Sequence, residues 1–173
     1  MSKKKVTKNQ FAEILFYWLS SHLTEKETKR NAKELGFRIR QWRSIKDFNK
    51  LFFELLILDM WLIEYTCENF FSNEEEKFEC EKLFHQLVYD RYVDKERYGF
   101  KDWIVLVTSL FIEYDKAMKT DHPSTPLWVV ANVINKRLFG ETKKDLSFQM
   151  KMIAHIGLFI KHLGEALINY EIE

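Results

Sequence analysis

Apolar residues recur along most of this chain with the spacing of amphipathic helices, and helix-start signals divide the pattern into segments. Three residue pairs have the spacing of a capping box, in which a hydroxyl accepts a hydrogen bond from an amide three residues later: Thr7 with Gln10, Thr24 with Glu27, and Ser72 with Glu75. Gly36 and Gly140 stand where helices would end in left-handed backbone. The pattern predicts helices over residues 8–23, 25–35, 45–71, 73–95, 101–119, 126–139 and 143–170.

Three stretches of these helices are apolar around most of their circumference: 51–65, 103–112 and 150–168. A helix of this kind is buried between other helices or lies at an interface. We therefore predict an all-α fold, a single-domain bundle of six or seven helices over residues 1–173, with residues 1–7 as a flexible basic tail. Because the connections are short, most neighbouring helices should run antiparallel, with 45–71 and 73–95 as the central hairpin. Three such stretches in one chain favour burial of part of this surface in a homodimer.

The composition agrees with helices and excludes several classes of protein. Only 5 glycines and 2 prolines are available for tight turns or sheet corners. No segment reaches the roughly 18 apolar residues that a membrane-spanning helix needs. Cys67 and Cys80 form no CxxC motif, so no disulfide framework is implied, and two buried thiols are expected. We expect a cytoplasmic protein that does not enter a membrane and needs no cofactor.

Charge is segregated along the chain. Residues 1–50 carry 13 Lys and Arg against 5 Asp and Glu, whereas residues 51–96 carry 4 against 12. The formal net charge of +1 therefore hides a basic segment beside an acidic one. Such a pair is either a binding surface or two faces that pack together.

The basic stretch from residue 29 to residue 43 alternates arginines with large apolar side chains. Arginine contacts phosphate and aromatic rings stack on bases, so this stretch is a candidate nucleic-acid-binding segment. The alternative is a solvated basic face beside the acidic residues 68–81. The residues that would bind nucleic acid are Lys33, Arg38, Arg40, Trp42 and Arg43.

Two sets of polar residues interrupt the most apolar helices. His155, His162 and Glu165 follow one stripe of a helix and are of the types that bind metal ions, although the sequence favours semi-buried or interface histidines over a metal site. Asp59 and Glu64 lie in the most apolar stretch, where a buried carboxylate needs a partner. For Asp59 the sequence offers three basic partners: Arg91, Arg97 and Lys101.

Signatures of catalysis, such as a phosphate-binding loop or a nucleophile elbow, are absent from the sequence. We therefore expect a non-catalytic helical protein with an interaction or regulatory role, which acts by binding another protein chain and forms a homodimer. Two alternatives remain open, a nucleic-acid-binding regulator and a small-molecule-binding helical bundle. Large aromatic side chains often anchor interfaces. The candidate anchors are Trp18, Trp42, Trp61, Trp103 and Trp128.

Overall fold

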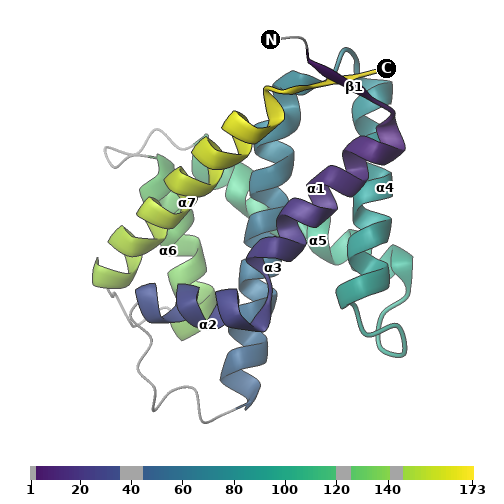
Figure 1. The fold of residues 1–173 in the computed structure, drawn as a ribbon. Helices are drawn as coiled ribbons and strands as arrows, with labels where there is room; N and C mark the ends of the chain where they lie inside the picture. The colour runs from purple at the N-terminus through teal and green to yellow at the C-terminus, as the bar shows by residue number, and fades with distance from the viewer. Residues whose placement is uncertain (1–2, 36–44, 120–125, 141–145) are drawn as a thin grey trace.

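The structure is a computed structural model that describes residues 3–35, 45–119, 126–140 and 146–173 (Figure 1). The elements in chain order are β1 (Lys4–Val6), α1 (Lys8–His22), α2 (Glu25–Glu34), α3 (Ile45–Cys67), the short 3-10 helix η2 (Glu68–Phe70), α4 (Glu74–Tyr92), α5 (Phe100–Met118), α6 (Pro126–Phe139), α7 (Leu146–Leu167) and β2 (Tyr170–Ile172). The predicted all-α bundle is confirmed. None of the helices in these ranges is both long and apolar enough to cross a bilayer.

Helix α3 runs through the middle of the bundle, and α1, α5, α6 and α7 all pack against it (Figure 1). Residues 55–58 and 60–63 are each at most 3% exposed, as expected for a helix that is apolar on all sides. The prediction of a central α3–α4 hairpin is wrong, because α4 packs mainly against α1. Coverage of α3 therefore comes chiefly from helices distant in sequence.

Three carboxylates on α3 link it to three surrounding helices. Glu54, Asp59 and Glu64 are spaced five residues apart, so each points about 140° around the helix axis from the one before. Each meets a basic side chain of a different helix: Glu54 contacts Arg137 of α6 at 2.8 Å, Asp59 contacts His155 of α7 at 3.6 Å, and Glu64 contacts His85 of α4 at 2.5 Å. The partners that the sequence offered for Asp59 are therefore wrong.

The two ends of the described chain pair with each other, which no local pattern predicted. β1 and β2 form a parallel ladder in which Lys4 is opposite Tyr170 and Val6 is opposite Ile172. Lys5 adds an ion pair with Glu173 at 2.7 Å. Residues 4–6, expected in a flexible tail, are instead a strand, and both termini lie at one end of the bundle (Figure 1).

Most helix ends follow the predicted signals. Thr7 and Gln10 form a full capping box, and Thr24 accepts a hydrogen bond from the amide of Glu27. Gly140 has a φ of 84°, the left-handed conformation expected after a helix. Gly36 lies outside the described residues.

The start of α4 lies one residue later than predicted. Asn73, and not Ser72, caps this helix, and its side-chain oxygen accepts from the amide of Glu76 at 2.9 Å. The Glu76 carboxylate accepts from the backbone amide of Ser72 at 2.7 Å. The cap is therefore shifted by one residue, and Glu76 reaches back to the amide of the residue before the cap, so Ser72 contributes its backbone and not its hydroxyl.

We predict that Asn73→Ala lowers the free energy of unfolding by about 1 kcal/mol, because the amide of Glu76 loses its acceptor. Ser72→Ala is the matched control and should change it by less than about 0.5 kcal/mol, since the Ser72 amide is retained. Urea denaturation of both variants measures the difference. An equal loss in the two variants would contradict this assignment of the cap.

Candidate functional site

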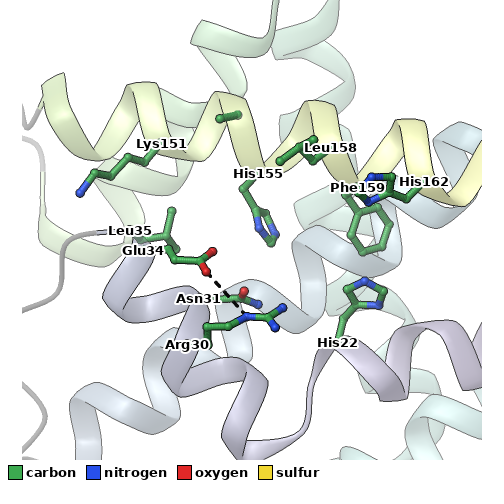
Figure 2. Close-up of a pocket in the computed structure, with 11 residues that line it drawn as sticks. His22, Arg30, Asn31, Glu34, Leu35, Lys151, His155, Leu158, Phe159 and His162 are labelled. Carbon is green, nitrogen blue, oxygen red and sulfur yellow. Dashed lines mark ion pairs between the residues drawn. The ribbon is translucent and has the colours of Figure 1, made fainter.

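The histidines of α7 face a pocket between α7 and the α1–α2 corner (Figure 2). The pocket has a volume of about 310 Å³, and His155, His162 and His22 line it. The ring of His155 points from α7 toward α2 (Figure 2). Glu165, the third predicted metal ligand, does not line the pocket; it is exposed and lies 4.0 Å from Lys161.

The predicted metal-binding set is therefore not brought together. Within the described ranges no group of three His, Cys, Asp or Glu side chains is arranged to hold a metal ion. The walls of the pocket carry both signs of charge, from Arg30 and Lys151 on one hand and Glu34 on the other. Arg30 already pairs with Glu27 and Glu34 along α2. The pocket thus carries two cations and one carboxylate besides its three histidines.

His155, which lines this pocket, forms an ion pair with Asp59 inside the bundle. Asp59 is 1% exposed, and its Oδ1 lies 3.6 Å from Nε2 of His155, which is a charge–charge contact and too long for a hydrogen bond. Burial by itself lowers the pKa of His155, but the Asp59 carboxylate outweighs burial and Glu34 adds to its effect, so the pKa of His155 is raised above its usual value. The pair stabilises the charged imidazolium inside the bundle.

The candidate nucleic-acid segment lies mostly outside the described residues. Lys33 is exposed on α2, whereas Arg38, Arg40, Trp42 and Arg43 fall in the range 36–44. The neighbouring basic residues of α2 pair within the helix, Lys29 with Glu25 and Arg30 with Glu27. These contacts do not involve the acidic residues 68–81. Binding of nucleic acid by this segment therefore stays a prediction.

The largest cavity among those described is a groove of about 750 Å³ between α4 and α5, with one wall residue from α3. Its apolar walls include three side chains that are well exposed: Phe78 at 67%, Val105 at 70% and Ile112 at 45%. The α5 wall runs from Phe100 to Asp115, a length of roughly 22 Å along the helix. An exposed apolar surface of this extent is typical of an interaction site.

Glu64, Glu81 and Asp115 supply three carboxylates to the floor of the groove, while the exposed Lys82 and Lys101 line its walls. The Glu64 carboxylate, held at 2.5 Å from Nε2 of His85, lies beside Glu81, which has no hydrogen bond or ion pair among the described residues. Burial and, after it, the charge of Glu64 raise the pKa of Glu81 to about 7. Asp115 accepts a hydrogen bond from Nε1 of Trp61 at 2.9 Å. The groove thus combines apolar walls with an unpaired carboxylate.

The two cysteines do not supply a nucleophile to either site. Cys67 and Cys80 are free thiols, and both are buried. Burial raises the pKa of Cys67 far above its usual value and that of Cys80 to about 11, so both stay protonated at neutral pH.

The groove was not predicted from the sequence, because the tryptophans were the expected interface anchors. Trp61 and Trp103 are at most 3% exposed, Trp18 and Trp128 are partly buried, and Trp42 lies outside the described residues. The exposed anchors are smaller residues on α5. Their spacing of seven, from 105 to 112, was the available signal, since that spacing places two apolar side chains on one helical face.

We predict that Asp59→Asn destabilises the protein more at acidic than at alkaline pH. The pKa of His155 is raised in the folded state, so the stabilisation by Asp59 is fully present below the unfolded pKa of histidine, about 6.5, and is lost as pH rises through the folded pKa. Urea denaturation across this range measures the difference between variant and wild type. His162→Gln, a change at an exposed histidine of the same helix, is the control and should show no such trend. A difference that is constant with pH would contradict the ion pair.

Comparison with protein-family models, with characterised proteins and with solved structures gave no significant match. The candidate sites therefore stand on the geometry of this chain alone.

Proposed function

We propose that this protein is a non-catalytic interaction module that binds an amphipathic helix of a partner protein in the α4–α5 groove. The observation that carries the proposal is the exposed apolar wall formed by Phe78, Val105 and Ile112 over a groove of about 750 Å³. A helix laid into such a groove buries its apolar face, which is a recurrent mode of peptide recognition. The hydrophobic effect supplies the affinity.

The length of the groove favours a helix over a compact ligand. The lining residues of α5 extend over roughly 22 Å, which equals about four helical turns. Small-molecule pockets bury most of their ligand, whereas here Phe78 and Val105 remain more than half exposed. A helical segment leaves its polar face in water and matches this open shape.

The proposal is tested by selecting displayed amphipathic peptides of about 15 residues, the length that fills the groove, on the wild-type protein. We expect helical binders that bind the double variant Val105→Gln/Ile112→Gln at least about tenfold more weakly, because the exposed apolar anchors are lost. Fluorescence anisotropy of labelled peptides measures the dissociation constants. Both changes are at exposed positions, so the fold should be retained.

The control is Leu146→Gln/Met150→Gln, which removes two equally exposed apolar side chains from α7. Binders should keep their affinity for this variant. If every selected peptide binds both variants alike, the groove is not the binding site. If apolar amines bind the groove and no peptide does, the site takes small molecules and the proposal is wrong.

Self-association through α7 is a second candidate, favoured by an apolar seam on its outer face. The seam consists of positions separated alternately by four and three residues, the spacing of a coiled coil. Leu146 and Met150 are 62% and 67% exposed, and a Cβ added to Gly157 or Gly164 would meet nothing within 4 Å. The full seam is Leu146, Met150, Ile153, Gly157, Ile160 and Gly164.

The order of large and small residues in this seam favours an antiparallel pair. Centred near position 155, such a pair sets Gly164 opposite Leu146 of a second copy and Gly157 opposite its Ile153. Each glycine then faces a large side chain, so the layers fill without voids. A parallel pair would set glycine opposite glycine and leave gaps.

We predict a homodimer with twice the chain mass of 21.0 kDa, measured by light scattering after size-exclusion chromatography. Leu146→Gln/Met150→Gln should shift the protein to a monomer, because the seam loses exposed apolar area. Val105→Gln/Ile112→Gln serves here as the control and should remain dimeric. A wild-type monomer at high micromolar concentration would rule this candidate out.

A further inference from the structure

A small side pocket opens off the acidic part of the α4–α5 groove. It has a volume of about 130 Å³ and shares Glu64, Glu81, Phe111 and Asp115 with the groove. An occupant of the groove can therefore place one long side chain into the pocket without leaving the groove.

Two stacked aromatic rings form one wall of the side pocket. The rings of Trp61 and Tyr65 have their centroids 5.4 Å apart with an angle of 28° between their planes. Tyr65 is 39% exposed, so part of its ring is accessible from outside. Aromatic faces attract cations, and the planar guanidinium of arginine also stacks on them.

The charges around the pocket are unbalanced. Four carboxylates line the pocket, and Lys77 is the one lysine among its lining residues. Lys77 lies 3.9 Å from Glu68. Glu64 is engaged by His85 and Asp115 by the Trp61 indole, so among the described residues Glu81 is the carboxylate with no hydrogen bond or ion pair. Burial and, after it, the charge of Glu64 raise its pKa to about 7 and outweigh the opposite effect of Lys77 and His85.

A second unsatisfied group lies on the same floor. His85 is 9% exposed, and its Nδ1 has no hydrogen-bond partner among the described residues, although its Nε2 contacts Glu64. Buried polar atoms are nearly always satisfied in the functional state of a protein. Because this Nδ1 is itself enclosed by protein, Glu81 and not His85 is the group that an occupant of the groove can meet.

We propose that the side pocket binds a basic side chain, with arginine the best fit, presented by the partner helix in the α4–α5 groove. This inference rests on the proposed function for the identity of the partner and deepens it by defining its chemistry as a basic amphipathic helix. The guanidinium would lie on the Tyr65–Trp61 wall and donate hydrogen bonds to Glu81.

The first test needs no helix and therefore separates this inference from the proposed function. N-acetyl-arginine amide is titrated into the protein near pH 8, where Glu81 is charged, while the NMR signal of the Trp61 indole is followed. We expect millimolar binding that shifts this signal, and about tenfold weaker binding of the neutral isostere N-acetyl-citrulline amide. Equal responses to the two compounds, or no response to either, would overturn the inference.

Two variants of the protein test whether Glu81 causes the preference for arginine over citrulline. Glu81→Gln removes the charge with little change in shape and should abolish the preference for arginine over citrulline. Glu75→Gln, the same change in the exposed first turn of α4 and outside the pocket, should keep the preference. A preference that survives in Glu81→Gln would show general attraction to an acidic surface and would overturn the inference.

The second test uses a peptide selected against the groove, with one arginine moved along its sequence. We expect one position at which arginine binds about tenfold more tightly than citrulline, and loss of that advantage in Glu81→Gln. If the peptides bind the groove without any such position, the pocket is not a basic-residue site and the proposed function still stands. If the peptides bind Val105→Gln/Ile112→Gln as tightly as the wild type while the arginine amide still binds, the proposed function is wrong. The inference that the side pocket binds a basic side chain then still stands.

Discussion

The arrangement of the bundle depends on how three carboxylates on the central helix are neutralised. Glu54, Asp59 and Glu64 leave α3 in three directions because five residues correspond to one turn and about 140° more. A carboxylate in an apolar interior is costly unless a cation accompanies it. Each of the three therefore requires that one particular helix, with its Arg or His at one particular height, lies on that side of α3: α6 for the first, α7 for the second and α4 for the third.

These pairs select an arrangement more than they add stability. The apolar surface of α3 would be covered equally well by several orders of the outer helices, because hydrophobic contact is non-directional. Replacing a buried ion pair by apolar residues is often neutral or stabilising, whereas removing one partner is strongly destabilising. In this chain the penalty for a mismatched helix is an unpaired buried charge. That penalty favours one order of helices, in which the helix next in sequence, α4, packs mainly on α1 while His85 and Tyr92 reach α3.

The helices could be predicted from the sequence, but their neighbours could not. Caps and periodicity are local signals, so Thr7 correctly predicts the start of α1. The predicted start of α4 is wrong by one residue, because Ser72 and Asn73 are both good caps. Strand β1 has three residues and pairs with the far end of the chain, so it carries no local signal. The partner of Asp59 depends on which helix reaches it across the bundle. The groove could not be predicted for the same reason, since the exposure of Val105 depends on how α4 and α5 pack against the other helices.

The same carboxylates explain why the groove between α4 and α5 stays open. Closing these helices over each other would take Glu64 and Glu81 out of water together, with His85 and Lys77 as the cations that act on Glu81, and two carboxylates sharing a dry space cannot both remain charged. The raised pKa of Glu81 shows this conflict already in the open groove. An entirely apolar helix that filled the groove would meet the same cost, because it would bury Glu81 without a partner. A helix that brings a cation avoids it. Selectivity then comes from the penalty imposed on the wrong partner, and the apolar walls supply affinity to any helix that escapes that penalty.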